Sequence, residues 1–260
     1  MEYLKNFYEN YDEDGRLLSQ HGQVEYITTR KYIDECLAAA GGRHILEVGA
    51  GTGRYSVALA KEGYEVTAVE LIEHNLELLR QKLDGTESLT AVQGNALDLS
   101  RFADDSFDLT LLLGPMYHLY SREDKLLALR EAVRVTRRGG YILVAYCMNE
   151  PTVIQYVFGL NRLGEVMELD MLTEDWHCIS KPKDLFELIR TEEIAELDGE
   201  LDVSRVKLIA TDGATNYLRD YIDKMDAETF ARWLDYHLTI CERQDLIGAS
   251  HHTLDILRKN

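Results

Sequence analysis

The sequence predicts an α/β fold built on an open sheet, and three observations carry this prediction. Residues 43–53 (RHILEVGAGTG) hold a short apolar run that breaks into a glycine-rich turn, and a helical segment follows. Residues 64–70 (YEVTAVE) alternate and are rich in β-branched side chains, as a strand would be. Strand and helix patterns continue to alternate as far as about residue 150. A buried strand followed by a glycine turn and a helix is the ligand-binding corner of an open α/β sheet.

The glycine turn excludes two common ligand types by its spacing. Gly49, Gly51 and Gly53 stand at alternate positions, and Glu47 precedes the first glycine by two places. Glycine permits positive φ and lets a ligand approach the backbone. The dinucleotide fingerprint G-x-G-x-x-G would need glycine where Arg54 stands. A phosphate-binding loop would need Gly-Lys followed by Ser or Thr, a tripeptide that this chain lacks.

The remaining elements follow from periodicity and from start and stop signals. Ser121 and Asp124 form a capping box, and the sequence R-R-G-G at 137–140 supplies cations and glycine where that helix should end. Gly63 is a plausible C-cap for the helix after the glycine turn. The expected helices are 28–40, 55–61, 73–83, 121–136, 184–197, 215–225 and 227–242. The expected strands are 43–48, 64–70, 89–93, 107–113, 141–146, 203–211 and 250–258.

The motif E-V-G-A-G-T-G, the acid that ends the second strand and the order helix, R-R-G-G, strand resemble the class I S-adenosylmethionine-dependent methyltransferases. The resemblance is to bacterial small-molecule enzymes of unassigned substrate, strong over 40–150 and by strand order alone over 200–260. It implies a Rossmann-like seven-stranded, mostly parallel sheet of order 3-2-1-4-5-7-6, with helices on both faces and an antiparallel last strand. It further implies a single domain over 1–260. Its expected parts are an N-terminal helical lid (1–40), a cofactor-binding core (41–150), a cap insertion (151–200) and the C-terminal strands six and seven with their helices (201–260).

This resemblance also implies the cofactor, S-adenosylmethionine, its product S-adenosylhomocysteine, and no metal. Glu70 is expected to accept hydrogen bonds from the ribose hydroxyls, although an acid there can also serve as an ordinary helix N-terminal residue. Asn95 stands where the family usually has an acid that meets the adenine amine, so its side-chain amide oxygen or its backbone would take that place. Tyr3, Phe7 and Tyr11 give the N-terminal segment an aromatic face that suits a sulfonium. The cofactor-binding residues so implied are Glu47, Gly49, Ala50, Gly51, Gly53, Glu70, Leu71, Asn95, Ala96, Leu113 and Tyr11.

Tyr117 and His118 are the candidate catalytic residues. They lie in Gly114-Pro115-Met116-Tyr117-His118-Leu119, directly after the fourth strand, at the corner that faces the transferring methyl group in the resembled family. His118 is the expected general base because the ordinary pKa of histidine lies near neutrality. Tyr117 is expected to orient the acceptor or to line the cation site. The alternative is that both side chains simply pack under a loop.

Composition limits the partners and the compartment. The formal net charge of −18 and the absence of a basic stripe argue against nucleic acid and against anionic membranes. No apolar run approaches the roughly 20 residues that span a bilayer. The four cysteines lie far apart, as expected of free thiols in the cytoplasm. No zinc motif is present, and strand alternation predicts that His251 and His252 point to opposite faces.

These observations predict transfer of a methyl group to an oxygen, nitrogen or sulfur atom of a small molecule by in-line displacement. Two other classes stay open. An NAD-type oxidoreductase could use a similar sheet, although Arg54 and the early acid argue against it. A non-catalytic cofactor-binding module is the second alternative, and an intact acceptor pocket beside residues 114–118 would count against it.

Overall fold

The computed structural model describes residues 2–8, 15 and 18–260, and its centre is one seven-stranded sheet. The strand order is β3-β2-β1-β4-β5-β7-β6, which confirms the predicted topology. Strands β1 to β5 pair in parallel, whereas β7 pairs antiparallel with both β5 and β6. The strands are β1 (His44–Val48), β2 (Glu65–Glu70), β3 (Leu89–Gln93), β4 (Phe107–Leu112), β5 (Thr136–Cys147), β6 (Val203–Ala210) and β7 (His252–Lys259).

The central strands form where the chain is almost continuously apolar. In β1 and β4, residues such as Ile45, Leu46, Leu111 and Leu112 are fully buried. A parallel strand covered on both faces needs apolar side chains in both directions, so these runs do not alternate with polar residues. This burial fixes the carboxyl ends of β1 and β4 side by side, where the glycine turn and the segment 114–118 begin.

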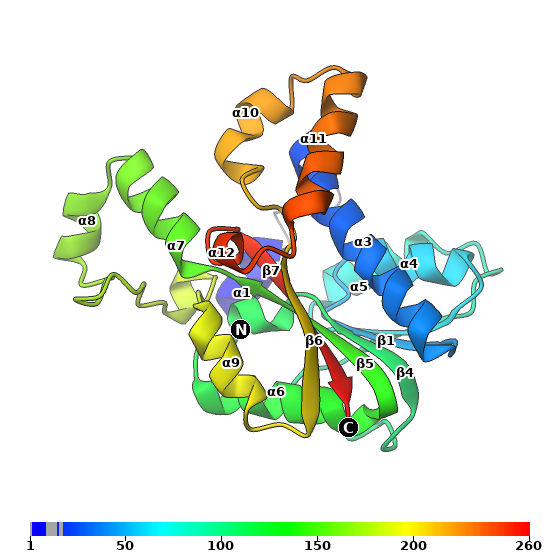
Figure 1. The fold of residues 1–260 in the computed structure, drawn as a ribbon. Helices are drawn as coiled ribbons and strands as arrows, with labels where there is room; N and C mark the ends of the chain where they lie inside the picture. The colour runs from blue at the N-terminus through cyan, green and yellow to red at the C-terminus, as the bar shows by residue number, and fades with distance from the viewer. Residues whose placement is uncertain (1, 9–14, 16–17) are drawn as a thin grey trace.

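Helices cover both faces of the sheet (Figure 1). On one face Ile33 of α3 and Leu59 of α4 pack with Ile45. On the other face Leu129 of α6 and Ile194 of α9 belong to a second cluster. The longer helices are α3 (Gln20–Ala40), α4 (Arg54–Lys61), α5 (Glu73–Gln81), α6 (Arg122–Val135), α9 (Thr191–Asp198) and α11 (Ala227–Ile240). The short ones are α1 (Glu2–Tyr8), η1 (Pro115–His118), α7 (Asn149–Thr152), the π-helical η2 (Val153–Gly159), α8 (Leu163–Glu168), η3 (Pro182–Asp184), η4 (Asn216–Leu218), α10 (Arg219–Ile222) and α12 (Gln244–Ile247).

Three predicted boundaries are wrong, each for a local reason. Helix α3 begins at Gln20 rather than at 28, because the side chain of Ser19 accepts a hydrogen bond from the Gly22 amide and caps it. The R-R-G-G segment belongs to β5, where Arg137 pairs with Asp108 on the neighbouring strand β4. The helix expected over 184–197 is α9 (Thr191–Asp198), which begins after Arg190 because Glu193 accepts the Arg190 amide.

Residues 149–190 form a separate arm between β5 and α9. Figure 1 shows α7 and α8 extending away from the sheet beyond the end of β5. An isolated β-bridge between Met148 and Ile189 joins the end of the arm to the residue that follows β5. A second bridge, between Leu172 and Cys178, lies within the arm. The arm therefore follows the carboxyl end of β5, and most of it belongs to the segment 151–200 that sequence analysis interprets as a cap insertion.

Candidate active site

The glycine turn lies directly after β1 and has the backbone that its sequence requires. Gly49, Gly51 and Gly53 have φ values of 77°, 54° and 84°, in the region that favours glycine. The Gly49 amide donates a 2.8 Å hydrogen bond to the Val69 carbonyl of β2. A β-carbon at position 49 would lie 2.6 Å from Pro115 Cδ, so the turn packs closely beneath the segment 114–118.

A cavity of about 410 Å³ opens at the carboxyl ends of β1, β2, β3 and β4, and we call it the β1–β4 cavity. Helix α1 covers part of it with Tyr3, Leu4 and Tyr8. The predicted site residues that line it are Gly49, Gly51, Glu70, Leu71, Asn95, Ala96, Leu113, Tyr117 and His118. Residues from four strand ends, far apart in sequence, therefore meet around one space.

Glu70 holds the shape of this cavity at the end of β2. Its carboxylate accepts hydrogen bonds of 2.8 Å from the Gly51 amide and of 2.8 Å from the Ile72 amide. Burial raises the pKa of Glu70, while the amides of Ile72 and Gly51 act in the opposite direction. The Asn75 side chain and the Leu71 amide also act to lower this pKa, so several donors hold the Glu70 carboxylate at the edge of the cavity.

Asn95 is arranged differently from the sequence-based expectation. Its amide oxygen accepts a 3.0 Å hydrogen bond from the Leu97 amide and closes a local turn after β3. The amide nitrogen and the backbone are therefore the groups that Asn95 can offer to a ligand. Gly53 lines neither cavity of this region, because it packs against Leu79 and Val57 at the start of α4. Tyr11 lies outside the described residues.

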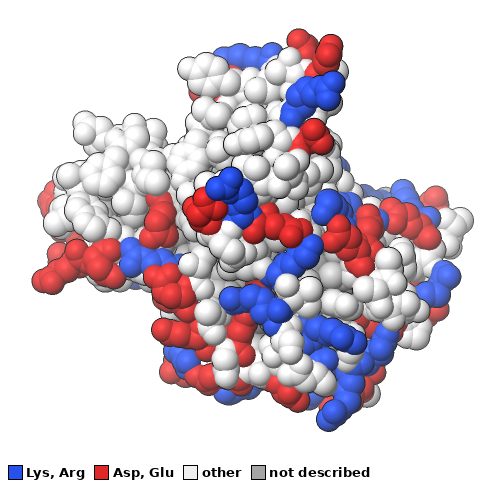
Figure 2. Space-filling view, viewed as in Figure 1, with Lys and Arg blue, Asp and Glu red and all other residues white. Residues whose placement is uncertain are grey.

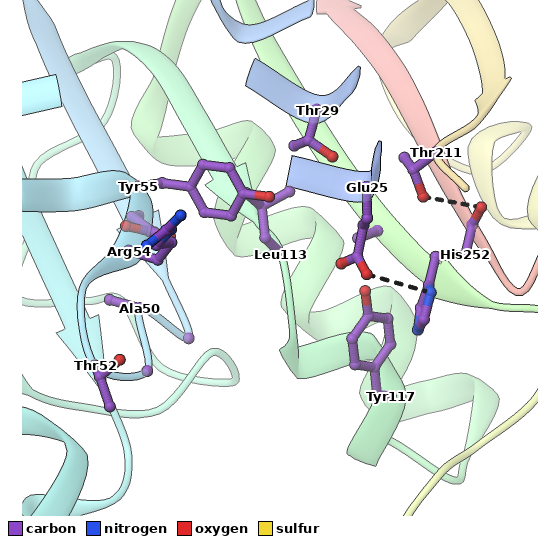
Figure 3. A pocket seen from close by; sticks show the side chains of 14 residues that line it. Glu25, Thr29, Ala50, Thr52, Arg54, Tyr55, Leu113, Tyr117, Thr211 and His252 are labelled. Carbon is purple, nitrogen blue, oxygen red and sulfur yellow. Dashed lines mark hydrogen bonds and ion pairs between the residues drawn. The ribbon is translucent and has the colours of Figure 1, made fainter. Parts of the chain in front are cut away.

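A second space of about 60 Å³ adjoins the turn on its other side, and we call it the turn chamber. Gly49, Gly51, Leu113 and Tyr117 line both spaces. The predicted residues Glu47 and Ala50 line the chamber, together with others that the sequence did not single out. Figure 3 shows Arg54 and Tyr55 on one side of this chamber and Glu25 and His252 on the other.

Two ionisable residues of the turn chamber, Glu47 and Arg54, have no opposite charge paired with them among the residues described. Glu47 is 2% exposed and accepts a hydrogen bond from the Ser56 hydroxyl. Burial raises the pKa of Glu47 to about 8, although Ser56 acts to lower it. The Arg54 guanidinium lies over the Tyr26 ring at 4.5 Å, and its buried Nε has no hydrogen-bond partner in the described ranges. A buried unpaired donor of this kind favours an anionic ligand group.

His118 lies in the β1–β4 cavity, yet both of its ring nitrogens are already engaged. Nδ1 lies 2.7 Å from the Leu185 carbonyl, and Nε2 lies 3.0 Å from the Tyr8 hydroxyl. Burial lowers the pKa of His118, against the effect of the Leu185 carbonyl. No ring nitrogen of His118 is therefore free to take a proton from an acceptor in this arrangement, and the ring ties α1 to the loop between η3 and α9.

Tyr117, the other candidate catalytic residue, lies between two cavities. It lines both the β1–β4 cavity and the turn chamber. Figure 3 shows its hydroxyl directed toward Glu25 and His252, and its ring centroid lies 5.9 Å from that of His252.

The structure also assembles a cluster that sequence analysis missed. Glu25, Asp212 and His252 bring one ligand-type atom each to within 4.8 Å of one another. The prediction that His251 and His252 face opposite sides is wrong, because both line the same two cavities. His251 precedes β7 and lies in a bend, so strand alternation does not apply to it. The polar end of β6 (Asp212) was the available signal.

A third cavity, of about 430 Å³, lies between the arm and the sheet, and we call it the cap cavity. Apolar side chains of the arm and of β5 form most of its wall, among them Met148, Val157 and Leu188. His252 lines both the turn chamber and the cap cavity. The turn chamber therefore adjoins the β1–β4 cavity at Tyr117 and the cap cavity at His252.

Comparison with known proteins agrees with this arrangement. Residues 46–144 match the methyltransferase domain family. The demethylmenaquinone methyltransferase of Clavibacter sepedonicus is 34% identical over 143 residues, which cover 54% of this chain and 55% of the relative. The ubiquinone biosynthesis O-methyltransferase of Alkalilimnicola ehrlichii is 28% identical, with 59% and 61% covered. The chain thus spans little more than half the length of these curated relatives.

Solved structures share the fold at low identity. A methyltransferase from Methanosarcina mazei aligns with a TM-score of 0.58 and 15% identity, covering 88% of this chain and 96% of that one. A [4+2]-cyclase aligns with a TM-score of 0.57 and 16% identity, with 90% and 81% covered. Because that neighbour is named for a different reaction, the fold by itself does not fix the chemistry.

Proposed function

We propose that this chain, whose residues 46–144 match the methyltransferase domain family, is a class I S-adenosylmethionine-dependent methyltransferase. It would transfer a methyl group to an oxygen, nitrogen or sulfur atom of a small molecule by in-line displacement. The observation that carries the proposal is the β1–β4 cavity, which joins the glycine turn to the buried carboxylate of Glu70. S-adenosylmethionine, when bound, supplies an electrophilic methyl group on a sulfonium.

The residues of the β1–β4 cavity fit the nucleoside part of this cofactor. Glu70 offers two carboxylate oxygens at the tip of β2, which suits a pair of ribose hydroxyls. Leu71 and Ile72 on one side and Ala96 and Leu97 on the other supply apolar surface for a planar base. The backbone of Gly49 and Gly51 can approach the ligand because neither residue has a β-carbon.

The turn chamber fits the amino-acid part. Arg54 would hold the carboxylate, because its buried Nε has no partner among the residues described. Glu47 lies in the same chamber, and a cationic amino group beside it would favour the ionised form of its carboxyl. We retain Glu47, Ala50 and Gly53 as proposed cofactor-site residues, Gly53 through the turn that it completes. Tyr11 stays a proposal too.

The catalytic contribution that we propose for this part of the chain is positioning. Orientation of reacting groups can contribute on the order of 7–11 kcal/mol. Tyr117 would orient the acceptor, since it faces both the β1–β4 cavity and the turn chamber. His118 would act as a positioning residue that holds Tyr8 of α1 and the Leu185 carbonyl together.

The proposed division of the chain follows the same logic. Residues 1–40 would act as a lid, since Tyr3, Leu4 and Tyr8 line the β1–β4 cavity. Residues 151–200 would act as the acceptor cap, with 41–150 as the cofactor core and 201–260 as the strands that close the sheet, all in one domain.

A small-molecule acceptor fits the charge of the chain better than a nucleic acid does. Acidic and basic side chains are interspersed on the face seen in Figure 2, and the net charge is −18. None of the helices described is long and apolar enough to cross a membrane. We propose a cytoplasmic location because all four cysteines are unpaired thiols.

The cap cavity argues against a non-catalytic binding module, because an apolar space of about 430 Å³ lies next to the turn chamber. Arg54, at the position of the third glycine in a dinucleotide fingerprint, argues against an NAD-type oxidoreductase.

The test is incubation with methyl-labelled S-adenosylmethionine and a metabolite extract, followed by identification of the labelled product. We expect one small molecule to acquire label, with much less label in Glu70→Gln. If S-adenosylhomocysteine binds but labelling equals that of heat-inactivated protein, the chain is a binding module and the proposal is wrong.

A further inference from the structure

The Glu25–Asp212–His252 cluster is built around a firmly held aspartate. Asp212 is 1% exposed, and its oxygens accept hydrogen bonds from the Ser250 hydroxyl at 2.6 Å and the Asn216 side-chain amide at 2.6 Å. His252 Nδ1 lies 2.8 Å from Asp212 Oδ2 and 3.6 Å from Glu25 Oε2. Since the donors around Asp212 are protein groups in hydrogen-bonding positions, the aspartate acts as an ionised acceptor that orients the His252 ring.

This orientation leaves the far side of the ring available. With the Nδ1 proton directed at Asp212, the neutral ring has its lone pair on Nε2. Nε2 forms no hydrogen bond with any residue in the described ranges. Figure 3 shows the ring next to Tyr117, on the acceptor side of the turn chamber.

Charge makes His252 the strongest proton acceptor among the histidines near the cavities. Burial by itself lowers the pKa of His252, but the charges of Glu25, Cys147 and Asp212 outweigh it and raise the pKa well above the ordinary value. The ring is therefore mainly in its neutral, proton-accepting form only at pH values above this raised pKa. Burial lowers the pKa of His251 to about 4, and its Nε2 is bonded to the Gln155 side chain at 2.6 Å. His118, whose two ring nitrogens are engaged, also has a lowered pKa.

The cap cavity, which His252 lines, limits the kind of acceptor that can bind next to this ring. Met148, Val157, Val166, Met171 and Leu188 give the cap cavity an apolar wall. An apolar wall of this kind disfavours an ionic acceptor such as a carboxylate or a phosphate. A base is needed where the attacking atom must lose a proton, as an oxygen acceptor does, whereas neutral amines often need none.

We infer that the Asp212–His252 pair, with Glu25 beside it, is the general base of an acceptor site in the cap cavity, and that the acceptor is a neutral, phenol-like hydroxyl compound with an apolar body. The inference rests on the proposed methyl transfer and names its acceptor and its base. The acceptor O–H bond breaks, its proton goes to His252 Nε2 and the electron pair stays on oxygen. That oxygen forms the new bond to the methyl carbon, and the pair of the broken C–S bond stays on sulfur.

The test uses 4-nitrophenol, because its ionised form absorbs visible light. The full-length protein, with and without S-adenosylhomocysteine, is titrated with the phenol at several pH values. We expect the bound phenol to ionise at a pH lower by about one unit than the free compound, since proton uptake by His252 stabilises the phenolate. In His252→Gln the phenol should still bind and this shift should vanish. His44→Gln, at an exposed position, is the matched control.

Each other outcome overturns the inference. Failure of the wild type to bind 4-nitrophenol excludes the phenol-like acceptor, and an equal shift in His252→Gln excludes this base. Loss of the shift on addition of EDTA would mean that a metal ion, rather than the imidazole, ionises the phenol. The proposed function is tested separately, by calorimetry with S-adenosylhomocysteine. The shift in phenol ionisation can be measured without S-adenosylhomocysteine, so the two tests can fail independently.

Discussion

The proposed cofactor side and the proposed acceptor side of this molecule are built in opposite ways. The glycine turn and Glu70 come from two adjacent strands and lie within 47–70. Their arrangement depends on backbone groups, because the Gly49 and Gly51 amides donate hydrogen bonds to the Val69 carbonyl and the Glu70 carboxylate. The acceptor side joins Glu25 of α3, Asp212 after β6 and His252 of β7, which meet because the sheet brings them together. A site made of contiguous backbone has a sequence motif, whereas a site made of converging side chains has none.

The largest expected effect is on the turn, where we predict that Gly49→Ala weakens S-adenosylhomocysteine binding about 100-fold. The new β-carbon would lie 2.6 Å from Pro115 Cδ at a residue whose φ is +77°, and such strain costs about 1–3 kcal/mol. Calorimetry measures the affinity and thermal unfolding checks the fold. Gly164→Ala is the control, because nothing lies within 4 Å of a β-carbon there. Unchanged affinity in Gly49→Ala would contradict the role of the turn.

Glu70→Gln should weaken the same ligand about 10- to 100-fold. A hydrogen bond to a charged group is worth about 1.5–3 kcal/mol, and glutamine also places an amide group opposite one of the Gly51 and Ile72 amides. Glu65→Gln, at the exposed start of the same strand, is the matched control and should leave affinity unchanged. Equal affinity of the two variants would mean that Glu70 does no more than an ordinary acid before a helix.

Much of the fold and of the cofactor side could be predicted from sequence because the signals there are local. The apolar runs of β1 and β4, the three alternating glycines and the acid of Glu70 each stand in a short segment. The strand order, confirmed by the structure, came from the family that these motifs resemble. Boundaries failed where a neighbour decided them, as at β5, where Asp108 of β4 holds Arg137 in the strand.

The acceptor side could not be predicted because its partners are distant in sequence. His118 was the expected base, but whether its nitrogens are free depends on Tyr8 and Leu185, two segments that periodicity does not place beside it. His252 is oriented by Asp212, which lies two residues beyond the end of β6, next to the start of β7. No spacing rule joins residues 25, 212 and 252.

A smaller effect is expected on the pKa of His252 when one of the two carboxylates beside it is removed. In Glu25→Gln we expect the pKa of His252 to fall by about one unit, because a negative charge 3.6 Å from Nδ1 is lost. Asp212, Cys147, Tyr117 and His251 also face the ring and are unchanged in this variant. Histidine ring NMR resonances, assigned with His252→Gln, measure the titration.

The sign of that shift is decisive. Glu25 stabilises the protonated ring, so its removal must move the midpoint to lower pH, and the base form then predominates from a lower pH upward. Glu35→Gln, on the exposed side of the same helix, should leave the midpoint unchanged. A rise in the midpoint of Glu25→Gln, or an equal shift in both variants, would exclude direct coupling of Glu25 to His252.

The last expected effect is on the free energy of unfolding and comes from the cofactor side. The pKa of Glu47 is raised to about 8 by burial, so the folded protein holds a proton that the unfolded chain releases above its ordinary value of 4.5. This contribution is complete below pH 4.5 and is lost as pH rises toward 8, by at most about 1.4 kcal/mol per pH unit. Glu47→Gln should lack this loss. Denaturant titrations at pH 5 and pH 8 compare the two proteins, and parallel pH dependence would contradict the buried, protonated acid.

Calorimetric titrations with S-adenosylhomocysteine and, separately, with NADH test the central claim most directly. The claim is that the β1–β4 cavity accepts the nucleoside of a sulfonium cofactor through the glycine turn and Glu70. We predict one site per chain for S-adenosylhomocysteine, weakened in Glu70→Gln, and no heat of binding for NADH. Binding of NADH without binding of S-adenosylhomocysteine would contradict it.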